Sequence, residues 1–149
     1  MPAQEMTDDL HSVAERRLRR IDQRYTSGRR AIIELLVRAG HPVSIEDIAA
    51  QLPGVPRSSA YRHLTDLQAA GLIRRVTSSD EFTRFELAED LTEHHHHLLC
   101  VNCGKVTDIT LPAGLEQQVT GAITKLTDME GFQAHSHRLD VLGLCATCQ

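Results

Sequence analysis

Two Cys-x-x-Cys motifs constrain the fold of this 149-residue chain more than any other feature, because a metal that joins them closes a loop in the chain. Each motif presents two thiolates from one tight turn, and two such turns complete the tetrahedral sulfur shell that suits Zn²⁺. The 41 residues between the motifs (104–144) exceed what a simple zinc ribbon needs, so the second motif would be tied back to the first strand of a larger domain. Four buried free thiols or a redox pair are the alternatives to a structural zinc held by Cys100, Cys103, Cys145 and Cys148.

Four consecutive histidines, residues 94–97, precede the first Cys-x-x-Cys motif. Side chains alternate between the two faces of a strand, so His94 and His96 would point one way and His95 and His97 the other. Each face can then begin a separate metal site, with nitrogen and oxygen ligands that suit Fe²⁺, Mn²⁺, Co²⁺ or Zn²⁺. A solvated histidine patch that binds metal adventitiously is the alternative. The side chains that can complete the two shells are Glu86, Asp108, Glu116, His135 and His137.

Composition bounds the core and the compartment. The chain is 41% apolar but only 3% aromatic and has no Trp, so its core must be built from Leu, Ile, Val and Ala. No apolar run approaches the ~18 residues needed to span a bilayer. The first 13 residues have neither the basic nor the apolar segment of a secretion signal. We therefore expect a cytoplasmic protein with no membrane partner, where cysteines are metal ligands more often than disulfides.

The charge distribution indicates two functions in one chain. Residues 1–80 contain 12 Arg, no Lys and 10 acidic residues, a balance of +2. Residues 81–149 contain 4 basic and 10 acidic residues, a balance of −6, together with all four Cys and six of the nine His. An arginine-rich half therefore precedes an acidic half that is rich in metal ligands.

The first half has the element order of a winged helix-turn-helix. Apolar periodicity predicts helices over residues 8–24, from the N-cap Thr26 to Gly40, from the N-cap Ser44 to Leu52, and from about Pro56 to Ala70. Two β-prone runs, 72–76 and 82–87, flank the polar turn 77–80 and predict a hairpin.

The second half has a different pattern. Residues 88–93 are acidic, lack apolar periodicity and indicate a hinge. Beyond them we expect strands near 94–99, 106–111 and 132–142, and a helix near 113–128. The predicted fold class is α+β, with a winged-helix DNA-binding domain over 1–87, the hinge over 88–93 and an α/β metal-binding domain over 94–149.

The fourth predicted helix is the candidate recognition helix, whose N-terminal part would enter the major groove. Arginine reads guanine edges, and Ser and Tyr reach phosphates. The segment 16–24 and the pair Arg29 and Arg30 would add phosphate contacts, although a solvated helix face is the alternative for any one arginine. The candidate DNA-contacting residues of the helix are Arg57, Ser58, Ser59, Tyr61 and Arg62.

Five segments carry a resemblance to the ferric uptake regulator family. They are Arg24-Tyr25-Thr26-x-x-Arg29, Ser59-Ala60-Tyr61-Arg62-x-Leu64, Phe85-Glu86-Leu87, HHHHLLCVNCGKVTD from His94 to Asp108, and SHRLDVLGLCATC from Ser136 to Cys148. The resemblance covers nearly the whole chain, and its most specific parts are the histidine run with its Cys motif and the closing segment.

The resemblance implies a dimeric, metal-activated transcriptional repressor whose C-terminal domain dimerises and whose winged helices bind a palindromic operator. Arg24 matches a basic residue that family members insert into the minor groove. A sensory site at the hinge would comprise Glu86, His95, His97 and Asp108. A second site in the dimerisation domain would comprise His94, His96, Glu116 and His137.

The regulatory metal implied by the resemblance is Fe²⁺, Zn²⁺ or Mn²⁺. The zinc-sensing branch commonly has a cysteine in its hinge site, whereas this chain has no Cys outside the two motifs. This difference slightly favours iron-type control of metal homeostasis, with a zinc- or peroxide-sensing repressor as the alternative. A metal-buffering protein would leave the Tyr61-Arg62 helix unexplained. We expect no enzyme, because neither an HExxH nor a nucleophile motif is present.

Overall fold

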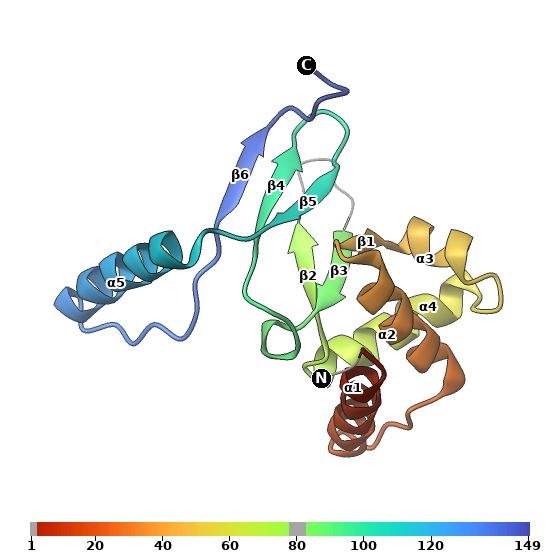
Figure 1. The fold of residues 1–149 in the computed structure, drawn as a ribbon. Coiled ribbons are helices and arrows are strands. Elements are labelled where there is room, and N and C mark those ends of the chain that lie inside the picture. The colour runs from red at the N-terminus through yellow and green to blue at the C-terminus, as the bar shows by residue number, and fades with distance from the viewer. Residues whose placement is uncertain (1–2, 78–82) are drawn as a thin grey trace. The chain divides into compact units, whose positions relative to one another are not determined.

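The computed structural model describes residues 3–77 and 83–149 (Figure 1). The chain forms two compact units, Met1–Glu93 and His94–Gln149, here called the N-terminal and C-terminal units. Helices and two three-stranded sheets make up the fold, so the predicted α+β class is confirmed.

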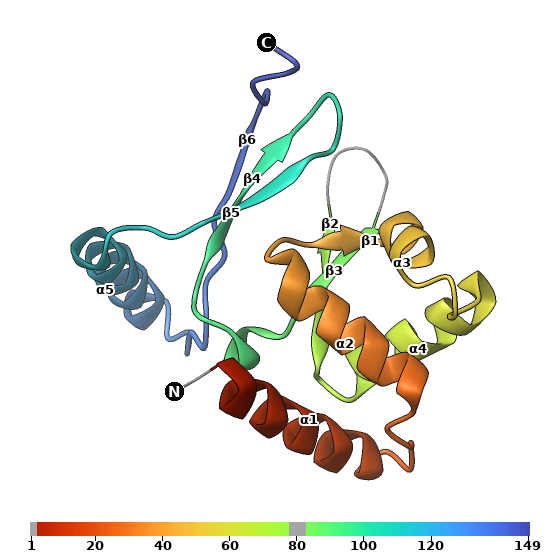
Figure 2. The same cartoon turned by 45° about the vertical axis from the view of Figure 1, so that its right-hand side comes forward.

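The N-terminal unit has the predicted order of helices followed by a β-hairpin. Helices α2, α3 and α4 pack with a three-stranded antiparallel sheet of order β1-β3-β2 (Figure 2). The predicted turn residues 78–80, and Phe82, lie outside the described residues. The elements are α1 (Ala3–Arg19), α2 (Ser27–Ala39), β1 (Val43–Ser44), α3 (Ile45–Gln51), α4 (Arg57–Ala69), β2 (Ile73–Thr77), β3 (Thr83–Leu87) and the 3₁₀ helix η1 (Glu89–Leu91).

Local side-chain chemistry places the helix ends. The Thr26 side chain accepts the Arg29 backbone N–H at the start of α2, and Gly40 ends that helix with a left-handed φ of 62°. Ser44 and Asp47 form a capping box at the start of α3. Both N-caps were predicted from the sequence.

Helix α1 is shorter at its C-terminal end than the predicted range of 8–24. The helix stops at Arg19, and Asp22 adopts a left-handed φ of 56°. The Gln23 N–H then donates to the Leu18 carbonyl at 2.9 Å, which caps the end of the helix.

The core of the N-terminal unit is aliphatic, as the composition requires. Its fully buried members come from α1, α2, α3, α4 and the sheet, and include Leu18, Ile32, Ile33, Ile48, Leu64 and Leu67. Burying each such side chain contributes about 1.5–3 kcal/mol. This core holds α4, the candidate recognition helix, in place from its inner face.

Arg29 does not face solvent, so the expectation that it adds a phosphate contact is wrong. Its side chain is 8% exposed and forms an ion pair with Asp66 on α4. The same guanidinium donates to the Arg24 carbonyl and, over 2.8 Å, to Gln23 Oε1. Arg29 therefore joins α2, the loop before it and α4.

The C-terminal unit has a three-stranded sheet of order β5-β4-β6. Strand β4 pairs antiparallel with β5 and parallel with β6. The elements are β4 (His96–Cys100), β5 (Val106–Ile109), α5 (Ala113–Met129) and β6 (Asp140–Gly143). No helix in the described ranges 3–77 and 83–149 has the length and apolar character to cross a membrane.

The strands of the C-terminal unit are shorter than predicted because pairing limits them. Strand β5 ends at Ile109, opposite His96, so His94 and His95 precede β4 instead of opening it. Strand β6 begins at Asp140, opposite His97, and residues 132–139 are irregular although they were predicted as strand.

Replacing Arg29 with Met should lower the free energy of unfolding of the N-terminal unit by about 3 kcal/mol, because Asp66 would lose its buried partner. The exposed Arg30, which pairs with Glu34 one helical turn away, provides the matched control. Arg30→Met should cost no more than about 0.5 kcal/mol. Both tyrosines, Tyr25 and Tyr61, lie in this unit, so tyrosine fluorescence during urea unfolding measures it selectively. Equal effects of the two substitutions would contradict the structural role of Arg29.

Candidate metal centres and nucleic-acid interface

The four cysteines converge at one end of the C-terminal sheet. The turn after β4 and the segment after β6 bring all four sulfur atoms within 4.8 Å of one another. Cys103 Sγ and Cys145 Sγ are 3.7 Å apart. A tetrahedral zinc with Zn–S bonds of about 2.3 Å would require sulfur atoms about 3.8 Å apart. The four residues therefore fit a sulfur-ligated Zn²⁺.

Backbone amides favour the thiolate form of two of these cysteines, Cys100 and Cys145. Backbone hydrogen bonds from Cys103 and Cys145 lower the pKa of the Cys100 thiol to about 6, and the Cys145 N–H lies 3.4 Å from Cys100 Sγ. A backbone hydrogen bond from Thr147 similarly lowers the pKa of Cys145. Gly104 closes the first turn with a left-handed φ of 73°, a conformation that favours glycine. Thiolate is the form that binds metal.

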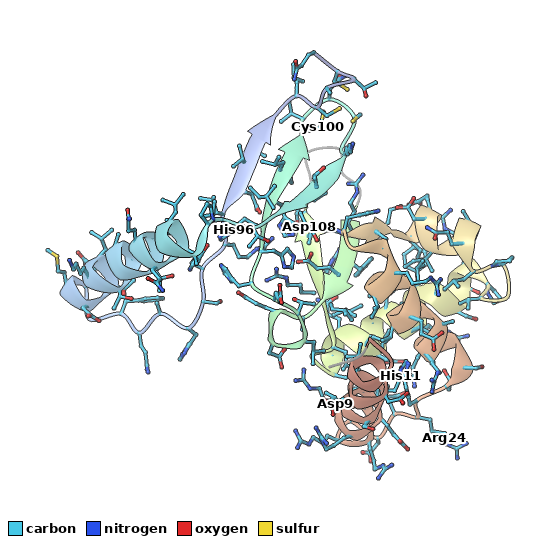
Figure 3. All side chains as sticks on the ribbon, viewed as in Figure 1. Asp9, His11, Arg24, His96, Cys100 and Asp108 are labelled. Carbon is cyan, nitrogen blue, oxygen red and sulfur yellow. The ribbon has the colours of Figure 1, made fainter. Side chains whose placement is uncertain are left out.

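A second cluster gathers around Glu116 at the other end of β4 (Figure 3). Glu116 lies in the first turn of α5, and its carboxylate is close to three imidazole rings. Its Oε1 is 3.3 Å from His94 Nε2 and 2.9 Å from His137 Nε2, and its Oε2 is 2.8 Å from His96 Nε2. The hydrogen bond with His96 lowers the pKa of the Glu116 carboxyl.

The geometry around Glu116 fits a metal better than a set of hydrogen bonds. His137 Nε2 and Glu116 Oε1 are buried and close, yet within the described part of the chain neither has a hydrogen-bond partner of acceptable angle. Buried polar atoms are otherwise almost always hydrogen-bonded. Ligand atoms that point at a common centre instead of at one another produce this arrangement.

A third group lies on the opposite face of β4. His95 Nε2 is 3.8 Å and His97 Nε2 is 3.7 Å from the two oxygens of Asp108, which is directly opposite His97 on β5. The two imidazoles meet edge to face with centroids 5.1 Å apart. The ligand atoms of the three residues all lie within 4.8 Å of one another. His95, His97 and Asp108 thus fit three ligands of a divalent metal.

Glu86, the fourth residue predicted for this site, belongs to the N-terminal unit. It lies on β3 with a buried side chain, and Arg74 Nε of β2 donates to its Oε1 at 2.5 Å. Arg74 also reaches Glu89 at 3.3 Å. The sequence analysis did not identify Arg74. The predicted hairpin could have indicated it, because Arg74 and Glu86 lie on its two strands and face each other there.

The candidate DNA-contacting residues lie on the outward side of α4. Arg57, Ser58, Tyr61 and Arg62 are exposed, and Ser59 is half-buried. Arg57 lies 6.0 Å from the Tyr61 ring centroid and donates to Glu46 Oε1 on α3 at 2.7 Å. The Arg24 side chain extends into solvent from the loop before α2 (Figure 3). This side of α4 is therefore free of the core and is basic at its N-terminal end.

Sequence reasoning also missed a second partner of the metal-ligand groups, Asp140. Asp140 Oδ1 lies 3.2 Å from His97 Nδ1, on the side of the ring away from Asp108. The pairing of β6 with β4 brings Asp140 to the site, and the sequence does not predict that pairing. The only hint in the sequence was that Asp140 lies in the segment from Ser136 to Cys148. His135, the other histidine considered as a ligand, is exposed.

A winged helix with an outward-facing basic helix, joined to a unit with clustered thiols, imidazoles and carboxylates, defines the class of metal-responsive transcription regulators. The model of the Ferric uptake regulator family matches residues 20–142. The chain belongs to the Ferric uptake regulator family, whose members are metal-responsive transcriptional repressors that bind operator DNA, not enzymes.

Individual relatives agree with this assignment. The chain is 30% identical to the peroxide operon regulator of Bacillus subtilis, over 99% of this chain and 96% of that protein. It is 29% identical to the peroxide-responsive repressor PerR of Staphylococcus aureus, over 89% of this chain and 86% of that protein. The solved ferric uptake regulator of Helicobacter pylori, described as having three functional metal-binding sites, is similar with a TM-score of 0.71 and 25% identity, over 93% of each chain.

Replacing Cys100 with Ser should remove one tightly bound zinc per chain and lower the thermal stability of the C-terminal unit. Structural zinc contributes ~10–16 kcal/mol of apparent binding free energy in small zinc modules, and that energy stabilises the fold. Val101→Ala, an exposed position in the same turn, is the matched control. Metal analysis and circular dichroism melting measure both effects. A Cys100→Ser protein with full zinc content and unchanged melting would show that the thiols are not a structural site.

Proposed function

We propose that this chain is a homodimeric repressor that binds a palindromic operator when a divalent metal is held by Glu86, His95, His97 and Asp108. The observation that carries this proposal is the convergence of His95, His97 and Asp108 within 4.8 Å at the start of the C-terminal unit. Glu86 ends the wing hairpin, only seven residues (87–93) before the histidine run. Ligands from both units on one metal would couple DNA binding to metal binding.

Ligand residues of the chain itself would couple metal binding to DNA binding. A bound divalent metal supplies the positive charge that draws these ligands together. Glu86 would then restrain the winged helix relative to His95 and His97, so that two recognition helices lie at the separation of two half-sites. Operator affinity falls with the fraction of molecules in the competent arrangement, so loss of these ligands weakens DNA binding without altering any DNA contact. Within the N-terminal unit, Glu86 also pairs with Arg74 of β2.

The proposed dimer is supported by a C-terminal unit that leaves much of its apolar surface exposed. Helix α5 has 17 residues and none is buried. Leu126, Met129 and Phe132 are 64%, 82% and 63% exposed, and Leu142 on the edge strand β6 is 65% exposed. The unit buries only Leu99, Cys100 and Val106 among its hydrophobic residues. A unit of this size with so small a core needs metal and a partner for stability, and a second copy provides both symmetry and matching apolar area.

The second His–carboxylate group and the cysteines have supporting roles in this proposal. Zn²⁺ on the four cysteines would hold the turn after β4 to the segment after β6. A metal on His94, His96, Glu116 and His137 would tie α5 to the sheet of the dimerisation domain. The regulatory metal is Fe²⁺, Zn²⁺ or Mn²⁺, since imidazole and carboxylate ligands suit all three.

A metal-titrated operator-binding assay tests the coupling. The probe is a duplex selected from a random pool by the wild-type protein, titrated with Mn²⁺ at buffered free concentration. His97→Ala should abolish or greatly right-shift the metal response, and His96→Ala should have a milder effect. Arg62→Ala, on the outward side of α4, should lower affinity by about 5- to 150-fold at saturating metal, because a base contact is worth ~1–3 kcal/mol.

Each outcome of that assay has a distinct meaning. A stronger effect of His96→Ala than of His97→Ala would show that the two faces of β4 are assigned the wrong way round. An unchanged metal response in both histidine variants would refute metal coupling through the histidine run. Unchanged affinity of Arg62→Ala, together with Ala variants at Arg57 and Tyr61, would refute the recognition-helix assignment.

Peroxide sensing is the second candidate. The similarity to two peroxide regulators supports it about as strongly as the lack of a cysteine outside the two Cys-x-x-Cys motifs supports iron sensing. In this reaction one oxygen atom of hydrogen peroxide is transferred to a ring carbon of His95 or His97, and the other oxygen leaves as water. Oxidation of a ligand would release the operator.

Exposing the Fe²⁺-loaded and the Mn²⁺-loaded protein to hydrogen peroxide separates the two functions. Peptide mass spectrometry should find one added oxygen on His95 or His97 only in the iron-loaded protein, with loss of operator binding. Unmodified histidines and retained operator binding would favour a repressor that responds to metal alone.

A further inference from the structure

We propose that Asp140 is a positioning residue for His97, an inference that rests on the proposed regulatory metal site. The Asp140 carboxylate accepts the His97 Nδ1–H and thereby directs Nε2 of the ring toward Asp108 as the ligating nitrogen. No part of the resemblance assigns a role to Asp140.

The geometry of the His97 ring supports this role. Its Nδ1 lies 3.2 Å from Asp140 Oδ1, and its Nε2 lies 3.7 Å from Asp108 Oδ1. The ring is 2% exposed, so water cannot take over the hydrogen bond at Nδ1. The imidazole therefore lies between two carboxylates, one on each side of β4, and each nitrogen has a different partner.

The position of Asp140 is set by the backbone. It is directly opposite His97 in the parallel pairing of β6 with β4, and the His97 N–H donates to the Leu139 carbonyl at 3.2 Å. Arg138 Nη2 lies 3.8 Å from the other oxygen, Asp140 Oδ2, and partly offsets its charge. The backbone pairing thus places the carboxylate next to His97, as an orienting group requires.

A hydrogen bond at one nitrogen of a histidine decides which nitrogen is available to a metal. A carboxylate at Nδ1 fixes the tautomer with Nε2 unprotonated and makes that nitrogen a better ligand. His96 provides an internal contrast, because its Nδ1 is buried and has no hydrogen-bond partner among the described residues. Of these two adjacent ligand candidates on β4, His97 alone has such an orienting carboxylate.

The tautomer of His97 can be measured without regulatory metal. Long-range ¹H–¹⁵N correlation spectra of the full-length protein, with one zinc per chain on the four cysteines, should show His97 protonated at Nδ1 in the wild type. Asp140→Ala should shift the population toward the Nε2–H form. Asp128→Ala, an exposed carboxylate of α5 in the same unit, is the matched control and should leave the His97 signals unchanged. A wild-type His97 protonated at Nε2 would overturn the proposal.

Metal affinity gives the second measurement. Co²⁺ titrations in a His137→Ala background, which leaves one complete His–carboxylate group, should show a 10–100-fold weaker Kd for Asp140→Ala. Asp140→Asn keeps an oxygen that accepts the Nδ1–H and should lose less. Asp128→Ala should bind as the background does. The visible Co²⁺ spectrum at saturation should be the same with and without Asp140, because a positioning residue does not ligate.

The outcomes separate this proposal from the proposed function. If His97→Ala weakens Co²⁺ binding and Asp140→Ala does not, the metal site stands and the role of Asp140 is wrong. If neither variant weakens binding, the metal site and the role of Asp140 both fail. If Asp140→Ala changes the Co²⁺ spectrum at saturation, Asp140 is itself a ligand and the positioning role is overturned.

Discussion

The hydrogen-bond ladders of β4 are the constraint on which the metal chemistry of the C-terminal unit depends. This five-residue strand pairs with β5 on one side and β6 on the other, and both ladders fix its register. Its first residue reaches Glu116, its second faces Asp108 and Asp140, and its last belongs to the sulfur cluster. A slip of one residue would exchange the two faces and dismantle both His–carboxylate groups at once. The register of β4 therefore fixes the geometry of the metal ligands.

The arginines of the N-terminal unit are of two kinds: one is buried and holds other elements in position, and others are exposed on the surface proposed to contact DNA. Arg29 is buried against Asp66 and holds the loop that carries Arg24, whereas Arg57 and Arg62 stay on the outward side of α4. An ion pair of this kind favours one arrangement more than it adds stability, because desolvating both charges offsets most of their attraction. What it provides is a defined relation between α4, the proposed recognition helix, and the loop before α2. A DNA-binding surface needs that definition, since its contacts must match fixed positions on a duplex.

The C-terminal unit has only a small hydrophobic core, and candidate metal-ligand groups lie where a larger core would otherwise be expected. Its buried side chains are three hydrophobic residues and the two histidines His96 and His97. Burying polar rings costs free energy unless they are hydrogen-bonded or ligated, so this unit depends on its carboxylates and on metal far more than the aliphatic N-terminal unit does. Apolar residues of α5 and β6 are exposed as well, and a second copy of the chain is the partner proposed to cover them.

Local pattern and side-chain chemistry in the sequence determined the helices, the hairpin, the α+β class, the cysteine cluster and the alternation of the four histidines. These follow from short-range physics, in which caps, periodicity and tight turns act within a few residues. The end of α1, the late start of β6, the burial of Arg29 and the approach of Asp140 to His97 were decided only by the tertiary structure. Each depends on a partner far along the chain, such as Asp66 for Arg29 or β4 for Asp140. Residue spacing carries no record of which distant strands pair or in which register, and that pairing decides which carboxylate each imidazole meets.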